Sequence, residues 1–168
     1  MNAVAMEELA LAPGERFLEI GFGGGALLRA ANAAGANVSG VDVSEAMVGR
    51  AKGLDVHLAS AEALPFPNGN FDKAASLNSL YFWSDPEAAL AEIARVLRPG
   101  GRLLLAFEPA PELRKYPGHV HGFRLFEVAE VRALMEQAGF GDITERWGKG
   151  RKPDLFCCLS GTLNGANG

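Results

Sequence analysis

Short apolar runs alternate with helical patterns along most of this chain. Runs bounded by glycine, proline or charged residues predict strands at 16–20, 37–42, 55–59, 72–77, 102–107, 142–147 and 155–160. Between the early runs, apolar residues recur at the three- and four-residue spacing of amphipathic helices. This alternation predicts an α/β fold with a mainly parallel sheet and helices on both faces. The last two runs lie close together and predict a final hairpin.

Capping residues mark the ends of several predicted helices. Ser44 and Asp85 each suit a helix N-cap, and Pro86 suits the first helical position after Asp85. In the last predicted helix, apolar residues recur on one side over 128–138, and we expect that helix to stop at Gly139.

The first predicted strand runs directly into a glycine-rich loop. Residues 17–20 (Phe-Leu-Glu-Ile) are followed by Gly-Phe-Gly-Gly-Gly at 21–25, and a helix is expected next. Because glycine has no Cβ, such a loop turns sharply and lets the backbone approach a ligand closely. Glycine also costs conformational entropy, so this density of glycines indicates a cofactor loop rather than a merely flexible turn.

Two kinds of cofactor fit the loop. Gly21, Gly23 and Ala26 match the G-x-G-x-x-A pattern of dinucleotide-binding proteins. Asp42 follows Gly21 at close to the spacing of ~20 residues that is expected of a ribose-binding acid. Glu19, however, would repel a pyrophosphate, whereas it suits a cationic amine. The residues therefore favour a cationic ligand and leave NAD as an alternative.

These motifs resemble those of the class I S-adenosylmethionine-dependent methyltransferases, in particular the UbiE-like or type 11 branch. The first motif of that family is an apolar strand ending in Glu or Asp, followed by G-x-G-x-G. The resemblance runs over about residues 13–160. It implies a Rossmann-like, doubly wound seven-stranded sheet in the order 3-2-1-4-5-7-6, with an antiparallel last strand. We expect one domain over 1–163 and a disordered tail over 164–168.

The resemblance implies S-adenosyl-L-methionine as cofactor, S-adenosyl-L-homocysteine as product and no metal. Glu19 and the glycine loop would hold the methionine end, and Asp42 would accept hydrogen bonds from the ribose hydroxyls. Ser60 stands where the family commonly has Asp or Asn beside the adenine amino group. The implied cofactor-binding residues are Glu19, Gly21, Phe22, Gly23, Gly25, Asp42, Val43, Met47, Ser60, Ala61, Glu62, Asn78 and Leu80.

Simpler roles remain open for two of these acids. Asp42 is alternatively a strand-end acid that assists Ser44 at its helix N-cap. Glu62 is alternatively a solvated residue at the start of a helix, where acidic residues are common.

Candidate acceptor-side residues come from two segments. Methyl transfer from a sulfonium needs mainly positioning and exclusion of water, so the lack of a catalytic triad is no objection. His119 or His121, within 108–126, would supply a general base, or else be solvent-facing or structural. Four aromatic residues are candidates for the pocket walls, with packing beneath the next helix as the alternative for the first three: Tyr81, Phe82, Trp83 and Tyr116.

A group of basic residues is a further candidate for contact with the acceptor. Arg146, Lys149, Arg151 and Lys152 are expected in the hairpin loop, where they would attract an anionic acceptor or simply keep a turn solvated.

Composition and net charge indicate which class of substrate the protein uses. The chain has 168 residues, a net charge of −4 and a pI near 5.4, which argue against a nucleic-acid substrate and for a small-molecule methyl acceptor. No apolar run predicts a membrane span and no export leader is evident, so we expect a cytoplasmic protein. The adjacent cysteines at 157 and 158 read as ordinary strand residues rather than as metal ligands.

The function that the sequence favours is methyl transfer from S-adenosylmethionine to a small molecule. Only residues 1–13 precede the first strand, so the site cover is expected from 108–126, from a partner subunit of a homo-oligomer, or is absent. The alternatives are a catalytically silent cofactor-binding module that acts through a partner and an NAD-binding protein. The latter is disfavoured because a chain of this length has little room for a second domain.

Overall fold

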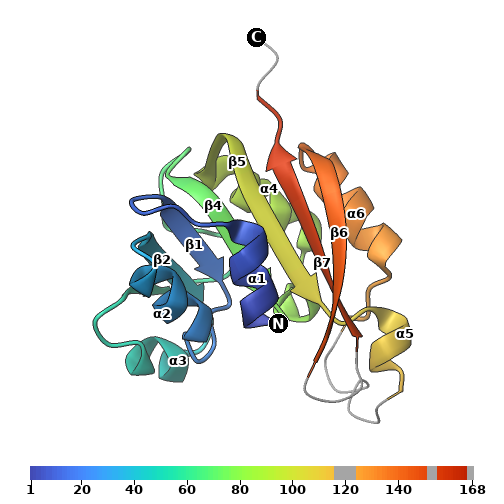
Figure 1. Ribbon diagram of the computed structural model, residues 1–168, viewed down its shortest axis with the longest axis horizontal. Coiled ribbons are helices and arrows are strands. Elements are labelled where there is room, and N and C mark those ends of the chain that lie inside the picture. The colour runs from blue at the N-terminus through green and yellow to red at the C-terminus, as the bar shows by residue number, and fades with distance from the viewer. Residues whose placement is uncertain (116–123, 151–154, 166–168) are drawn as a thin grey trace.

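Seven strands form one sheet in the order β3-β2-β1-β4-β5-β7-β6 (Figure 1). The computed structural model describes residues 1–115, 124–150 and 155–165. β7 runs antiparallel to both β5 and β6, and the other described pairs are parallel. The predicted fold class, strand order and antiparallel last strand are therefore confirmed. The strands are β1 Arg16–Ile20, β2 Asn37–Asp42, β3 Asp55–Leu58, β4 Phe71–Leu77, β5 Leu97–Phe107, β6 Phe140–Lys149 and β7 Leu155–Leu163.

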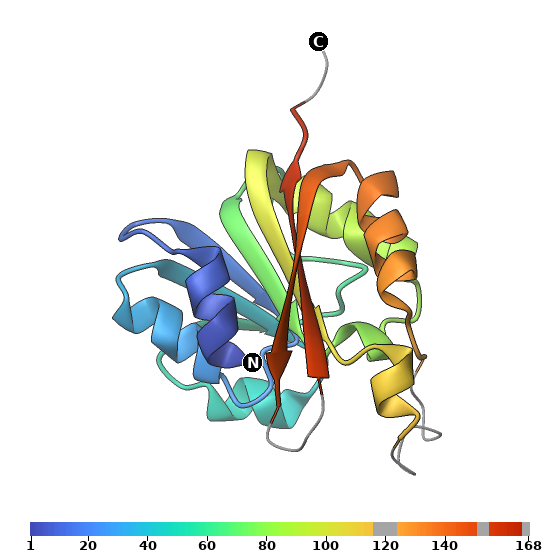
Figure 2. The ribbon, with the colours of Figure 1, turned by 45° about the vertical axis from the view of Figure 1, so that its right-hand side comes forward.

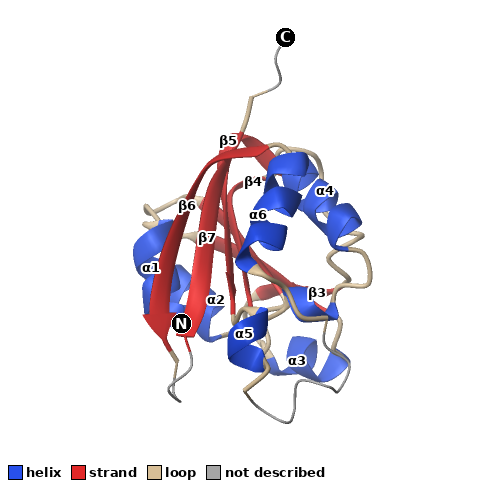
Figure 3. Ribbon diagram, turned by 90° about the vertical axis from the view of Figure 1, so that its right-hand side faces the viewer, coloured by secondary structure: helices blue, strands red, loops and turns tan. Residues whose placement is uncertain are grey.

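Helices cover both faces of this sheet, as predicted (Figure 2). On one face, α1 and α2 pack on side chains such as Phe17 and Leu104. On the other face, α4 and α6 pack on Leu18 and Leu103, and Figure 3 shows these two helices side by side. Successive strand residues thus enter opposite cores, because side chains alternate across a strand. The helices are α1 Asn2–Leu9, α2 Ala26–Ala33, α3 Glu45–Arg50, η1 Leu80–Phe82, α4 Pro86–Val96, α5 Ala110–Leu113 and α6 Val128–Gln137.

The predicted helix caps are confirmed. The Ser44 hydroxyl accepts from the N–H of Met47 at the start of α3, and the Asp85 carboxylate accepts from the N–H of Ala88 at the start of α4. Gly139, with φ 101°, follows the end of α6. These short polar side chains satisfy N–H groups that have no partner within a helix.

Several boundaries differ from the prediction. β5 begins at Leu97 rather than at 102, because Leu97 pairs with Phe71 before the register shifts. Asn164, expected in a disordered tail, donates its N–H to the Gly139 carbonyl oxygen, and 166–168 lie outside the described residues.

The predicted basic hairpin loop is wrong for its first two members. Arg146 and Lys149 lie within β6. The Arg146 guanidinium pairs with Glu7 at 2.7 Å and with Glu8 at 2.9 Å, so it fastens α1 to the edge of the sheet. Arg151 and Lys152 lie outside the described residues.

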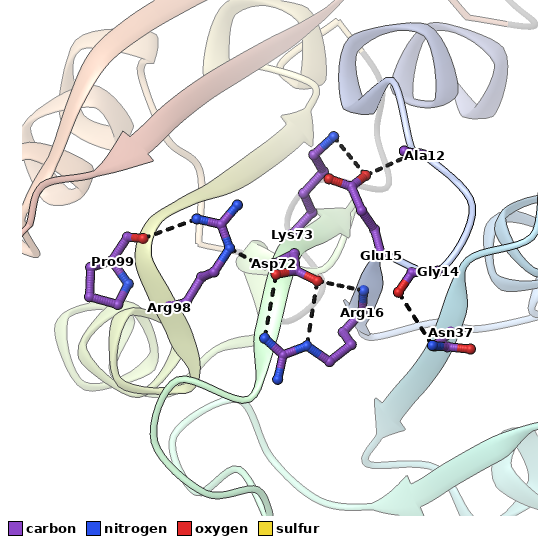
Figure 4. A network of polar contacts seen from close by, with 9 residues as sticks. All are labelled: Ala12, Gly14, Glu15, Arg16, Asn37, Asp72, Lys73, Arg98 and Pro99. Carbon is purple, nitrogen blue, oxygen red and sulfur yellow. Dashed lines mark hydrogen bonds and ion pairs between the residues drawn. The ribbon is translucent and has the colours of Figure 1, made fainter.

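A polar network fixes the amino ends of β1 and β4, far from the carboxyl ends of these strands (Figure 4). The Asp72 carboxylate accepts from the Arg16 backbone at 2.8 Å and from the Arg98 side chain at 2.8 Å. Burial of Asp72 would raise its pKa, but these hydrogen bonds outweigh burial and lower the pKa to about 2. The network therefore contributes stability at neutral pH that is lost as the pH falls from about 4 toward 2.

Replacing Lys73 by methionine is expected to lower the free energy of unfolding by about 1–2 kcal/mol. The Lys73 ammonium donates to the carbonyl oxygens of Leu9 at 2.7 Å and Ala10 at 3.1 Å. It also pairs with Glu15 at 3.0 Å, as Figure 4 shows. Methionine keeps the apolar stem but loses all three contacts. Urea denaturation measures the change, with Lys115→Met, which removes an exposed ion pair, as the control. A loss for Lys73→Met no larger than that of the control would contradict the anchoring of α1.

Candidate active site

Two cavities meet at the carboxyl ends of β1, β2 and β4. The larger, about 450 Å³, lies between the glycine loop, the end of β2 and the segment after β4. The smaller, about 270 Å³, lies between the glycine loop and the start of α1. Gly21, Gly23 and Asn78 line both. Ligands of open α/β sheets bind at this end of the strands, so the pair of cavities is the candidate site.

Most predicted cofactor residues line one of these cavities. The larger holds Gly21, Gly23, Asp42, Val43, Met47, Ser60, Ala61, Glu62 and Asn78. The smaller adds Glu19 and Phe22. Gly25 instead forms the N-cap of α2, and Leu80 is buried in the core beneath the site.

Sequence analysis missed other lining residues. Met1 and Asn2 reach the smaller cavity from α1, and Figure 1 shows the N-terminus near the carboxyl ends of the central strands. Phe82, by contrast, is one of the predicted pocket aromatics, and it lines the larger cavity with 60% of its surface exposed. For α1 the signal was weak, since Ala5 and Leu9 are its two buried residues and no side chain caps it.

The glycine loop is held in a conformation that favours glycine. Gly21, Gly23 and Gly25 have φ values of 74°, 54° and 79°. The N–H of Gly21 donates to the Val41 carbonyl oxygen at 2.8 Å, which ties the loop to β2. A Cβ at Gly21 would collide with the side chain of Ser79, whereas one at Gly24 would meet open space.

Replacing Gly21 by alanine is therefore expected to destabilise the fold by about 1–2 kcal/mol, the cost of left-handed backbone in a residue with a Cβ. Gly24→Ala is the matched control, because its backbone is not left-handed and its Cβ has room. Thermal and urea unfolding of both variants measure the difference. Equal stability of the two variants would contradict the geometry of the loop.

Asp42 supports the loop directly. Its two carboxylate oxygens accept from the N–H groups of Gly23 and Ser44, each at 2.9 Å. The assisting role at Ser44 is thus confirmed. It does not exclude ligand binding, because each carboxylate oxygen accepts more than one hydrogen bond.

Glu19 is an unusual acid because it is buried and incompletely bonded. It is 3% exposed, and its Oε2 has no hydrogen-bond partner among the described residues. Burial raises the pKa of Glu19 to about 8, a hydrogen bond from the backbone of Leu28 opposes the rise, and the nearby charge of Asp42 adds to it. A buried acceptor without a partner is costly, so a donor entering the smaller cavity would satisfy it.

Glu62 ties the larger cavity to the segment after β4. Its carboxylate accepts from the Ser84 hydroxyl and the Asp85 N–H, each at 3.1 Å. It lies in a turn closed by Ala63 and Ser60 rather than in a helix, so the interpretation of Glu62 as a helix-start residue is wrong.

The predicted acceptor residues lie in different environments. Trp83 lines the larger cavity. Tyr81 is buried, its hydroxyl contacts Asn78 and Glu108, and it lines neither cavity. Tyr116, His119 and His121 lie outside the described residues.

Comparison with known proteins places the chain in a family. The family model described as a methyltransferase domain matches residues 18–105. The uncharacterised methyltransferase YdaC of Bacillus subtilis is 31% identical over 168 residues, which cover 95% of this chain and 90% of YdaC. The chain belongs to the class I S-adenosylmethionine-dependent methyltransferases.

Solved structures of other methyltransferases have the same fold. An S-adenosylmethionine-dependent methyltransferase of Thermotoga maritima superposes with a TM-score of 0.78 at 26% identity, over 97% of this chain and 87% of that one. A chain from the complex that contains the Trm112 methyltransferase activator of Haloferax volcanii superposes with a TM-score of 0.87 at 21% identity, over 97% and 88%. The present chain matches only 33–68% of the length of further curated relatives, and several of these relatives are O-methyltransferases.

The site of this methyltransferase fits the cofactor of its family. The larger cavity has apolar walls from β1 and β2 and polar groups at Asp42 and Ser60, as an adenosine requires. The smaller cavity presents the incompletely bonded Glu19, which suits the ammonium of a methionine.

Two further findings concern other kinds of site. In 1–115, 124–150 and 155–165, no group of three or more metal-ligating side chains comes together. No helix in the described part of the chain has the length and apolar character to cross a membrane.

Proposed function

We propose that this protein transfers the methyl group of S-adenosylmethionine to a small-molecule acceptor. The observation that carries the proposal is the buried Glu19 carboxyl, incompletely bonded, in a cavity that shares its lining with a second, nucleoside-sized one. A dinucleotide would place a pyrophosphate near this acid, and that group has no donor for Oε2, whereas an ammonium supplies one and favours the ionised carboxylate.

Each part of the cofactor has a matching group in this proposal. Glu19 accepts from the ammonium of the methionine, and the exposed backbone of the glycine loop lies along it. Asp42 accepts from the ribose hydroxyls while it keeps the loop in shape. Ser60 and Ala61 lie beside the adenine, and Val43 and Met47 pack against it.

The methyl-transfer step needs little from the protein beyond positioning. Held by Glu19 and Asp42, S-adenosylmethionine would supply a sulfonium methyl group for transfer to the electron pair of the acceptor, and its sulfur would retain the electrons of the broken bond. Asn78, at the meeting of the two cavities, lies where the two halves of the cofactor join. Trp83 and Phe82 form apolar walls there and exclude water from the reacting atoms.

The acceptor is best explained as a small molecule. The net charge is −4, and Arg146, one of the two described members of the basic group, is paired with two glutamates. This distribution disfavours a polyanionic substrate. The N–H of Arg124 donates to the Tyr81 carbonyl oxygen at 3.2 Å, and His119 and His121 lie outside the described residues. A general-base role for either histidine stays a prediction, as does a homo-oligomer.

A turnover assay tests this function. The purified protein is incubated with S-adenosylmethionine and a panel of phenols, quinols, amines and thiols, and formation of S-adenosylhomocysteine is measured. Acceptor-dependent formation supports the proposal. Binding of S-adenosylmethionine without turnover of any acceptor contradicts it.

That second outcome favours the alternative, a cofactor-binding module that acts with a protein partner. The structural neighbour solved in complex with a methyltransferase activator motivates this alternative. Repeating the assay with cell extract depleted of small molecules separates the two, because turnover that requires a macromolecular fraction indicates a partner.

A further inference from the structure

We propose that Tyr81 is a positioning residue whose hydroxyl fixes the amide of Asn78 at the meeting of the two cavities. The inference rests on the proposed function and goes beyond it, because it assigns Tyr81 to the geometry of the cofactor site rather than to contact with the acceptor. It depends on three contacts of the Tyr81 hydroxyl, one within the segment after β4 and two with Glu108 after β5.

The Tyr81 hydroxyl joins the ends of β4 and β5. The hydroxyl lies 3.0 Å from Oδ1 of Asn78, the residue that follows β4. It also accepts a hydrogen bond from the N–H of Glu108, the residue that follows β5. The carbonyl oxygen of Glu108 is farther away, at 3.4 Å. The ring itself is 6% exposed and packs in the core beneath the site.

The direction of these hydrogen bonds follows from their donors. A backbone N–H can only donate, so the phenol oxygen accepts from Glu108 and its own proton goes to Asn78 Oδ1. Burial raises the pKa of Tyr81, so this proton stays in place at physiological pH. Because Oδ1 is held in this way, the orientation of the Asn78 amide is fixed, and its NH₂ group remains as a donor. Asn78 lines both cavities, so this donor belongs to the candidate site.

Asn78 needs such support because its backbone is strained. Its φ is 52°, in the left-handed region, and its N–H donates to the Ala106 carbonyl oxygen at 2.8 Å. Non-glycine residues adopt this conformation at a cost and persist there when their surroundings hold them. Asparagine tolerates the region better than most residues, and its side chain offers the oxygen that Tyr81 binds.

A double-mutant cycle tests the inference, with calorimetric affinity for S-adenosylhomocysteine as the readout. Tyr81→Phe keeps the ring and removes the hydroxyl, and should weaken binding about 3–10-fold, the scale of one neutral hydrogen bond. Asn78→Gly adopts φ 52° without strain and has no amide to orient. Adding Tyr81→Phe to Asn78→Gly should therefore change the affinity by less than about twofold.

Thermal unfolding of the same proteins separates positioning from packing. Ile93→Val, in the core of α4, is the matched control, since it should lower stability and leave affinity unchanged. Wild-type affinity in Tyr81→Phe, or an equal loss of affinity in both backgrounds, would overturn the inference and leave the proposed function intact. Absence of S-adenosylhomocysteine binding by the wild-type protein would overturn both.

Discussion

Replacing Asp42 by alanine is expected to weaken binding of S-adenosylmethionine and S-adenosylhomocysteine by about 1.5–3 kcal/mol, without unfolding the domain. The variant loses the carboxylate proposed to accept from the ribose hydroxyls. It also loses the two bonds that this carboxylate makes to the N–H groups of Gly23 and Ser44. Isothermal titration calorimetry measures the affinity, and circular dichroism checks the fold.

Two further variants separate ligand contact from loop support. Asp55→Ala removes an exposed acid of β3 that is hydrogen-bonded to Ser39 and His57 and does not contact the glycine loop. This variant should bind both sulfur compounds with wild-type affinity. Asp42→Asn keeps one acceptor oxygen and should fall between wild type and alanine. Unchanged affinity in Asp42→Ala would remove the ribose role.

The second large effect concerns Glu19 and pH. In the protein without cofactor, burial raises the pKa of Glu19 to about 8 from an ordinary value of 4.5. Between these values the folded state holds a proton that the unfolded state has lost, so the free energy of unfolding falls as the pH rises. The slope reaches about 1.4 kcal/mol per pH unit. Glu19→Gln cannot titrate and should show a flatter dependence between pH 5 and 8.

Urea denaturation of both proteins across this pH range measures the difference. Saturating S-adenosylhomocysteine provides an internal check, because its ammonium would favour ionised Glu19 and reduce the slope of the wild type. Identical slopes for wild type and Glu19→Gln in the absence of ligand would contradict the assignment of the titration to Glu19.

The positions of the strands along the chain and the glycine loop could be predicted from the sequence because their causes are local. Apolar runs bounded by Gly and Pro set the strands, and Ser44 and Asp85 cap helices through neighbours three residues away. The position of Glu19 relative to Gly21 likewise follows from one strand and one turn. The resemblance to a known family supplied the strand order, which local patterns leave open.

The remaining features depend on contacts between distant segments. Arg146 was expected in the hairpin loop after the sixth strand, yet its partners Glu7 and Glu8 lie at the other end of the chain. Tyr81 was assigned to the acceptor pocket by its aromatic character, but the juxtaposition of its hydroxyl with Glu108 requires β4 and β5 to be neighbours. The depth of Glu19, and hence its raised pKa, could likewise be read only from the folded chain.

Calorimetric titration of the purified wild-type protein with S-adenosylmethionine, S-adenosylhomocysteine and NADH tests which cofactor the site binds. We expect binding of both sulfur compounds and none of NADH, because an ammonium donates to the Glu19 carboxyl and favours its ionised form, whereas a pyrophosphate has no proton to donate to it. Binding of NADH without binding of either sulfur compound would contradict it.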